Sequence, residues 1–231
     1  MTELAPGIHS LGHGAGGHVH AFLIEEGGEL ALVDTLFESD ARLVLEAIRG
    51  LGRSVTDLKR IAITHAHRSH LGGLAALKRA SGATVFAHAW EADIVSGDRR
   101  AQPVTLLPRQ SLRLLPFQIG LRLNRPKHVP CPVDAGLEDG DAFGPLQVLH
   151  AAGHSPGHLA FFWPERGFLI AGDAIATWPE FCAGWTAFTL NRTQHQASLR
   201  RMASLDARIV GVGHGDPIAQ DAADRVHRLA A

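Results

Sequence analysis

Residues 61–70 read Ile61-Ala62-Ile63-Thr64-His65-Ala66-His67-Arg68-Ser69-His70, and this stretch decides how the rest of the chain is interpreted. An apolar run that ends in polar residues predicts a strand leading into a turn. Three histidines at spacings of two and three residues can then direct their imidazole rings into one small volume. Neutral imidazole is the commonest protein ligand for zinc-like ions, so the stretch predicts a metal site.

Length, composition and charge are typical of an ordinary globular protein. The chain has 231 residues, of which 45% are hydrophobic and 19% charged, and its formal net charge is −1. A nucleic-acid surface needs an excess of positive charge, so we expect no nucleic-acid partner and a small-molecule substrate. We expect no membrane span and no signal peptide, because the chain lacks the apolar runs that these require. Two cysteines, Cys131 and Cys182, are too few for a disulfide framework, so we expect a cytoplasmic protein.

The apolar pattern predicts two similar halves. The first half should contain a hairpin, then a helix, a strand, a helix and a strand, over residues 19–24, 30–33, 40–51, 58–64, 71–80 and 84–87. The second half should contain three strands, a helix, a strand and a helix, over residues 146–149, 159–163, 168–171, 194–205, 208–212 and 221–229. Two sheets that pack on each other, with helices outside, make a four-layer αββα sandwich. We therefore predict an α+β fold, with one domain over residues 1–231.

Residues 96–140 interrupt this pattern. Seven of the 12 prolines lie in this stretch or just after it, at Pro103, Pro108, Pro116, Pro126, Pro130, Pro132 and Pro145. We predict a Pro-rich insertion with one or two short helices, which covers the core and shapes a pocket. The alternative is that residues 106–123 contact a membrane surface or a second copy of the chain.

Four further residues complete a candidate site at predicted strand ends. His154, Asp173 and His214 each lie beside glycine, in the segments GHSPGH (153–158), LIAGDAI (169–175) and VGHGDP (212–217). Glycine lets the backbone bend sharply and come close to a bound ion. Asp34 also ends a strand, where it could accept a hydrogen bond that orients a ligand histidine.

In this order, Asp34, the segment ITHAHRSHLGGLAALK (63–78) and the three glycine-flanked segments resemble the five signature motifs of the metallo-β-lactamase superfamily. The chain is most similar to its small bacterial metallo-hydrolases, a group that includes lactonase-, glyoxalase II- and β-lactamase-like proteins. The resemblance implies the following ligands: His65, His67 and His154 for a first metal, His70 and His214 for a second, and Asp173 as a bridge. It also implies that Asp173 and His214 act in catalysis, and that one or two Zn ions bind, with Mn or Fe as alternatives.

Ser69 departs from that pattern, since the family normally has an aspartate there that ligates the second metal. A neutral hydroxyl is a poor partner for a dication, so the second site loses one negative charge. Three outcomes fit: a dinuclear site in which a water fills the gap, a mononuclear site of three histidines, or an inactive protein. We favour the dinuclear form, because the other ligands of the second site are retained.

The expected function is that of a metallo-hydrolase whose metal-bound hydroxide attacks an ester, thioester, lactone or lactam. Trp178, Phe181, Trp185 and Phe188 follow Asp173 and predict an apolar pocket wall, which favours acyl substrates over phosphodiesters. Ordinary core packing is the other interpretation of these aromatic residues. The alternative functions are a catalytically weakened metal-binding protein of the same fold and a phosphodiesterase-type hydrolase. Both a monomer and a homodimer are compatible with the sequence.

Overall fold

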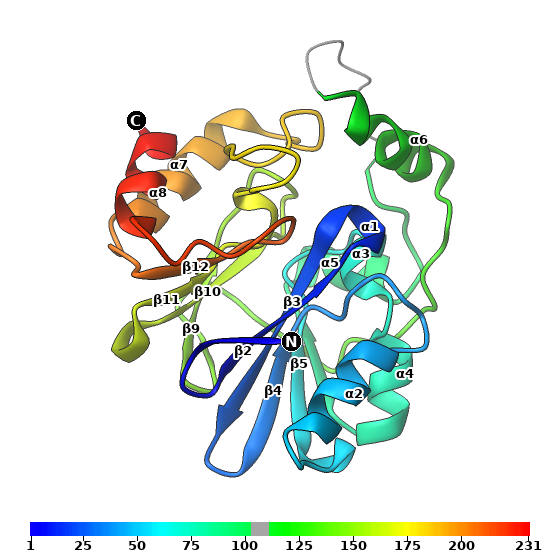
Figure 1. Cartoon of the computed structure of the whole chain (residues 1–231). Helices are drawn as coiled ribbons and strands as arrows, with labels where there is room; N and C mark the ends of the chain where they lie inside the picture. Colours follow the sequence, from blue (N-terminus) through cyan, green and yellow to red (C-terminus); the bar gives the residue numbers. More distant parts are fainter. Residues whose placement is uncertain (103–110) are drawn as a thin grey trace.

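Two β-sheets lie face to face in the computed structural model, which describes residues 1–102 and 111–231 (Figure 1). The first sheet has the strand order β1-β2-β3-β4-β5-β6-β7. Its strands are β1 (Thr2–Ala5), β2 (Ile8–His13), β3 (Val19–Glu26), β4 (Glu29–Val33), β5 (Leu58–Ala62), β6 (Thr84–Ala87) and β7 (Ala135–Gly136). The second sheet has the order β12-β11-β10-β9-β8. Its strands are β8 (Ala142–Phe143), β9 (Leu146–His150), β10 (Leu159–Trp163), β11 (Phe168–Ile170) and β12 (Ile209–Gly211).

The central strands are buried on both faces, which explains why their sequences are apolar without a polar face. In β3, Ala21 and Leu23 belong to the core under the helices, whereas Phe22 and Ile24 belong to the core between the sheets. Strands β4, β10 and β11 alternate between the two kinds of core in the same way. One set of side chains therefore holds the sheets together while the other holds the helices.

Helices cover the outer face of each sheet (Figure 1). The first sheet is covered by α2 (Arg42–Gly50), α4 (Leu74–Ser81) and α5 (Ala89–Val95), and the second by α7 (Arg192–Ala203) and α8 (Ala222–Ala230). The short helices are α1 (Ala15–His18), η1 (Val55–Asp57), α3 (Arg68–Leu71), η2 (Leu112–Leu114), α6 (Leu115–Leu123), η3 (Pro164–Arg166) and η4 (Gly172–Ala174). The layers run helix, sheet, sheet, helix, which confirms the predicted α+β αββα sandwich.

The structure adds elements that the apolar pattern did not predict. These are β1, β2 and α5 among the longer elements, together with the two-residue strands β7 and β8. The predicted strand over 58–64 ends at Ala62 instead. Thr64 leaves the strand because its backbone N–H and its hydroxyl both donate hydrogen bonds to the side chain of Asp34.

The Pro-rich stretch 96–140 is described except for residues 103–110, so any contact made by residues 106–110 lies outside the described part of the chain. After this gap the stretch forms η2 and α6, as the predicted short helices. Phe117 and Leu121 on α6 line a cavity, while Leu112 and Leu123 are exposed. Helix α6 therefore forms part of a cavity wall.

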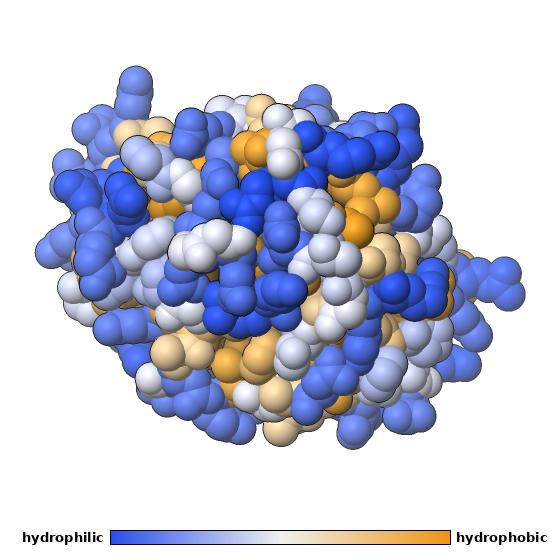
Figure 2. All heavy atoms as spheres, turned by 90° about the horizontal axis from the view of Figure 1, so that it is seen from below, coloured by the Kyte–Doolittle hydropathy of each residue, from blue (hydrophilic) through white to orange (hydrophobic). Residues whose placement is uncertain are grey.

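Within the described residues, no helix is long and apolar enough to cross a membrane. Figure 2 shows the face seen from below, where hydrophilic side chains predominate and hydrophobic groups are interspersed among them. The large apolar residues are mostly in the cores described above.

Phe22 is predicted to be essential for the packing of the two sheets. It is 1% exposed, and its ring centroid on β3 lies 5.8 Å from that of Phe168 on β11. Phe22→Ala should lower the free energy of unfolding by about 3–5 kcal/mol, because it leaves a cavity between the sheets. Urea denaturation followed by tryptophan fluorescence measures this change.

The matched control is Leu112→Ala, because the Leu112 side chain is 85% exposed. This change should alter the free energy of unfolding by less than about 0.5 kcal/mol. A loss below about 1 kcal/mol for Phe22→Ala would contradict a core that depends on this ring.

Candidate metal centre

Six polar side chains meet where strands of both sheets end. They are His65, His67 and His70 after β5, His154 after β9, Asp173 in η4 after β11, and His214 after β12. Each follows the carboxyl end of its strand, so these strand ends come together at one edge of the sandwich. The structure thus brings together all six residues singled out in the sequence, in two groups that share Asp173.

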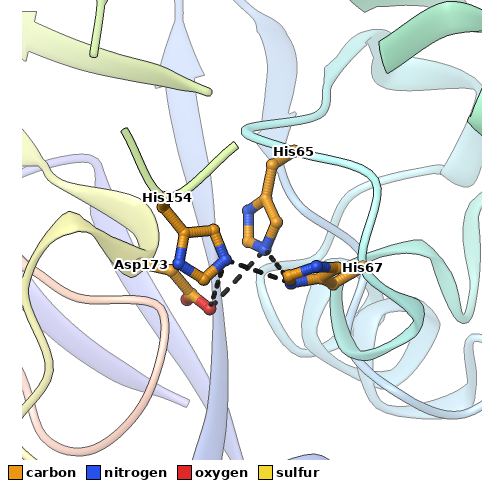
Figure 3. A group of neighbouring side chains, drawn as sticks. All are labelled: His65, His67, His154 and Asp173. Atoms are coloured by element: carbon orange, nitrogen blue, oxygen red, sulfur yellow. Dashed lines mark hydrogen bonds and ion pairs between the residues drawn. The ribbon is translucent and has the colours of Figure 1, made fainter. Parts of the chain in front are cut away.

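In the first group, the side chains of His65, His67, His154 and Asp173 point toward one another (Figure 3). His67 Nδ1 lies 3.0 Å from His65 Nε2 and 3.1 Å from His154 Nε2. Asp173 Oδ2 lies 3.5 Å from each of these two Nε2 atoms. Four atoms of the kind that bind metals therefore surround one small volume.

The spacing and chemistry of these four atoms fit a bound ion. A tetrahedral ion with bonds of about 2.0–2.1 Å holds its ligand atoms roughly 3.4 Å apart, close to the separations above. Hydrogen bonds alone do not explain the cluster, because His67 Nδ1 carries at most one proton and yet approaches two ring nitrogens. Three imidazoles with one carboxylate form a donor set that suits zinc or iron.

The second group consists of His70, Asp173 and His214, all of them buried. His70 Nε2 lies 3.3 Å from Asp173 Oδ1, and His214 Nε2 lies 3.4 Å from Asp173 Oδ2. The contact between His70 Nε2 and Asp173 Oδ1 lacks hydrogen-bond geometry, and neither atom has another hydrogen-bond partner within the described part of the chain. Buried polar atoms are rarely left unpaired, so these two fit ligands for a second ion.

Asp34 orients a histidine in each group. Its carboxylate accepts hydrogen bonds from His70 Nδ1 at 2.8 Å and from the backbone N–H and hydroxyl of Thr64 at 2.9 and 2.8 Å. Because the Thr64 hydroxyl donates to Asp34, its oxygen is free to accept from His65 Nδ1, which lies 3.0 Å away. Both imidazoles then turn Nε2 toward the centre, which is the orienting geometry expected for Asp34.

Backbone carbonyl and aromatic contacts hold His214. Its Nδ1 donates to the carbonyl oxygen of Gly17 at 2.7 Å, and the Trp185 ring stacks on it with centroids 4.1 Å apart. Gly17 has φ +86°, and a Cβ there would lie 3.0 Å from the Trp185 ring and 3.3 Å from His214 Nδ1. Glycine is therefore needed for α1 to come this close to His214.

Asp173, which belongs to both groups, is packed closely against the neighbouring backbone. A Cβ on Gly213 would lie 2.0 Å from Asp173 Oδ1, so no larger residue fits at that position. The backbone N–H of Asp173 donates to His158 Nε2 at 3.1 Å. His158 is buried and was not predicted as a site residue. Its one sequence signal is the repeated Gly-His pair in 153–158.

Glu91 connects the ligand loops of the two halves. Its carboxylate accepts hydrogen bonds from the backbone N–H of Ala66, at 3.0 Å, and from the Ser155 hydroxyl. Ala66 separates two ligand histidines of the first half, and Ser155 follows His154 in the second half. Burial raises the pKa of Glu91, although these hydrogen bonds oppose the shift. Sequence reasoning missed Glu91 because it lies on α5, which the apolar pattern did not reveal.

Burial keeps the first group of histidines neutral. It lowers the pKa of His67 to about 4, and it holds the pKa values of His65 and His154 well below the usual range, with help from neighbouring imidazoles. Burial likewise lowers the pKa of His158 to about 3. Neutral imidazole is the form that binds metals, so these rings need not lose a proton first.

The charges of the second group depend on one another. Burial alone would raise the pKa of Asp173, but His214 and His70 outweigh it and hold that pKa well below its usual range. Burial alone would lower the pKa of His70, but the carboxylates of Asp34 and Asp173 raise it to about 10. Without an ion, a protonated His70 therefore balances part of the negative charge at the centre.

A cavity of about 550 Å³ opens onto both groups. His67, Asp173 and His214 are among its lining residues, and Ser69 lines it beside them. Ser69 is half-buried, so its hydroxyl lies at the cavity surface rather than in the core. The position at which the sequence departs from the family motif is thus next to the candidate metal ligands.

The aromatic residues after Asp173 divide between the cavity and the core. Trp185 and Phe188 both line the cavity. Trp178 and Phe181 are not among the described lining residues. Trp178 packs against Trp185, with ring centroids 5.8 Å apart, and the Phe181 ring lies under the Arg225 guanidinium of α8. The expected aromatic wall is therefore corrected to Trp185 and Phe188.

Comparison with known proteins identifies a family. A family model described as the metallo-beta-lactamase superfamily matches residues 14–214. The uncharacterized protein YobT of Bacillus subtilis (strain 168) is 29% identical, over 85% of this chain and 83% of its own length. A hydroxyacylglutathione hydrolase of Aeromonas hydrophila is 30% identical over 80% of this chain, which spans only 56% of the length of that relative.

Solved structures agree with this match. A metallo-beta-lactamase family protein from Thermus thermophilus has a TM-score of 0.69 and 30% identity, covering 99% of this chain and 79% of that chain. A protein solved in a di-iron-bound form has a TM-score of 0.68 and 27% identity, covering 96% of this chain and 98% of that chain.

Asp34→Asn should weaken metal binding while preserving the fold. An asparagine of the same size cannot accept from both Thr64 and His70, because one of its two atoms is an N–H donor. We expect the zinc dissociation constant to rise by about 10- to 100-fold, as for other residues that orient metal ligands. Competition with a chromophoric chelator measures the constant. Asp40→Asn, at an exposed carboxylate of the same loop, should leave it unchanged. Equal constants for the two variants would show that Asp34 does not orient the ligands.

Ser69→Asp should strengthen binding of a second ion. The new carboxylate would add a negative charge beside the second group, and we expect the affinity for the second equivalent of zinc to increase at least about ten-fold. Ser69→Asn has nearly the same size without the charge and serves as the control. Calorimetric titration of the metal-free protein gives both stoichiometry and affinity. If aspartate and asparagine behave alike, position 69 does not face the ions.

Proposed function

The chain belongs to the metallo-β-lactamase superfamily, and from this premise we propose that it is a metal-dependent hydrolase that cleaves an ester, thioester, lactone or lactam. One observation carries the proposal: His65, His67, His154 and Asp173 converge at 3.0 to 3.5 Å, and His67 and Asp173 of this group line a cavity large enough for a small molecule. Such a cavity, with a few convergent polar groups at its base, is the usual form of an active site.

The residues of the chain have distinct roles in this proposal. His65, His67 and His154 hold a first ion, His70 and His214 hold a second, and Asp173 lies between them. Bound divalent ions would supply a nucleophile from water at neutral pH and polarise the substrate carbonyl group. The donor set favours zinc, with iron or manganese as the alternatives.

The cavity wall supports an acyl substrate. Trp185 and Phe188 present apolar surface next to the imidazoles, since Trp185 stacks on His214 and the Phe188 ring lies 6.1 Å from the ring of His67. They would contact the acyl portion and exclude bulk water from the reacting carbonyl. In hydrolysis the oxygen of water bonds to the acyl carbon, and the leaving alcohol, thiol or amine takes up a proton. A relative named hydroxyacylglutathione hydrolase adds weight to a thioester.

Ser69 supports a second candidate, a metal-binding protein of the same fold with little catalytic activity. The position lines the cavity but provides no charge to the second ion. A phosphodiesterase-type hydrolase is the third candidate. It has less support next to the candidate ligands, because Trp185 and Phe188 offer no charge there to a phosphodiester, although cationic residues also line the cavity.

Activity measurements separate these functions. The zinc-loaded protein should hydrolyse at least one of an aryl ester, a thioester, a lactone and a lactam. His67→Ala removes a ligand and should lower kcat/KM by more than about 100-fold. His227→Ala, at a side chain that is 52% exposed, should leave kcat/KM unchanged.

Three results would contradict the proposal. Cleavage of bis-p-nitrophenyl phosphate alone would favour a phosphodiesterase. Firm metal binding without turnover of any substrate would favour the non-catalytic protein. Equal activity of His67→Ala and the unmodified protein would place the reaction elsewhere.

A further inference from the structure

The cavity is strongly biased toward positive charge, although the chain as a whole is not. The protein has 22 lysines and arginines against 23 acidic residues. The described residues that line the cavity include five with cationic side chains, Arg68, Arg99, Arg100, Arg125 and Lys127, but only one with a carboxylate, Asp173. Asp173 lies within 3.5 Å of four imidazole nitrogens, and every other charged residue of the described lining is cationic.

Two of these cations are already engaged in the wall. The Arg68 guanidinium donates to the carbonyl oxygens of Lys127 and Phe37 and lies 4.5 Å from the centroid of the Phe37 ring. The Arg99 guanidinium donates to the carbonyl oxygen of Trp90 and lies 4.1 Å from the centroid of its ring. Such contacts fix the two side chains in place, so we assign them a structural role.

The other three cations, Arg100, Arg125 and Lys127, remain available. All three are exposed, and their side chains form no hydrogen bond or ion pair with any residue in the described ranges. Because these three residues are exposed and also line the cavity, we place them at its mouth. A single surface cation is usually just solvated, but three around one opening with no acid among them create a local positive potential.

Apolar side chains line the cavity next to the metal ligands. Trp185 stacks on His214, and the Phe117 ring of α6 lies 5.8 Å from the ring of Trp185. The chain then runs from α6 directly to Arg125 and Lys127. The described lining therefore combines candidate metal ligands, aromatic side chains and cationic residues.

We propose that the natural substrate carries an anionic oxygen group, a carboxylate or a phosphate, which an apolar portion separates from the acyl bond to be cleaved. Arg100, Arg125 and Lys127 bind this anion at the mouth while the apolar portion lies against Phe117 and Trp185. The inference rests on the proposed hydrolase function for the acyl bond. The recognition of an anion can be measured separately.

A set of aryl esters tests the inference through turnover. Their six-carbon acyl chains end in a methyl group, a carboxylate or a phosphate. At low ionic strength, the zinc-loaded protein should show a kcat/KM about ten-fold higher for the anionic esters than for the methyl ester, a size expected for partly screened charges. This preference should decrease as salt is added. The more favoured of the carboxylate and the phosphate identifies the group.

Charge variants connect the preference to the mouth. The triple variant Arg100→Gln, Arg125→Gln and Lys127→Gln should bring the ratio of anionic to neutral kcat/KM close to one. A triple variant with the same loss of charge, Lys59→Gln, Arg113→Gln and Arg122→Gln, removes exposed cations that do not line the cavity, and it should keep the ratio. Equal ratios for the two triple variants would overturn the inference.

Binding of uncleavable analogues keeps the test independent of catalysis. The monoanilide of adipic acid carries the carboxylate, and hexananilide is its neutral counterpart. Quenching of tryptophan fluorescence reports their binding, because Trp185 lines the cavity. The unmodified protein should bind the anionic anilide more tightly than the neutral one. Loss of this difference in the triple variant of Arg100, Arg125 and Lys127, but not in the control triple variant, supports anion recognition even if no ester is hydrolysed. Equal affinity for the two anilides contradicts it, whatever the result for hydrolysis.

Discussion

The site depends on one buried negative charge, the carboxylate of Asp173, which lies among imidazole rings supplied by both sheets. A carboxylate this deeply buried would normally gain a proton, because burial disfavours the charged form. Here His70 and His214 hold its pKa well below the usual range. His70 follows a strand of the first sheet, whereas His214 follows a strand of the second. The charge therefore has both of these partners only when the two sheets are packed, which couples the assembly of the site to the fold.

Much of the fold and the site could be predicted from the sequence because both leave local signals. Strands that alternate between two apolar cores give continuous apolar runs, so β3, β4, β10 and β11 were located correctly. Each candidate ligand follows such a run, and His154, Asp173 and His214 also lie beside glycine. At Gly213 the reason is physical, since a Cβ there would lie 2.0 Å from Asp173 Oδ1. The backbone geometry that the site requires is therefore visible in the sequence.

What the sequence did not reveal depends on contacts between distant residues. Glu91 acts through hydrogen bonds to Ala66 and Ser155, which are 25 and 64 residues away, and no local pattern encodes such a contact. The aromatic residues after Asp173 show a related limit. Their sequence does not say which face each ring takes, so Phe181 was expected in the wall but packs under Arg225. In an irregular loop, the direction of each side chain depends on the residues that pack against it.

The candidate metal ligands and the proposed substrate-binding residues come from different parts of the chain. The residues proposed for the reaction are therefore distinct from those proposed to select the substrate. The candidate ligands lie at strand ends of the shared fold, whereas Phe117, Arg125 and Lys127 come from the Pro-rich stretch. Anomalous scattering from a crystal soaked in zinc tests the central claim most directly. We predict a peak at the zinc absorption edge within about 2.3 Å of His65 Nε2, His67 Nδ1 and His154 Nε2. A crystal saturated with zinc that shows no peak there, or shows one only at other residues, would contradict a metal centre built around Asp173.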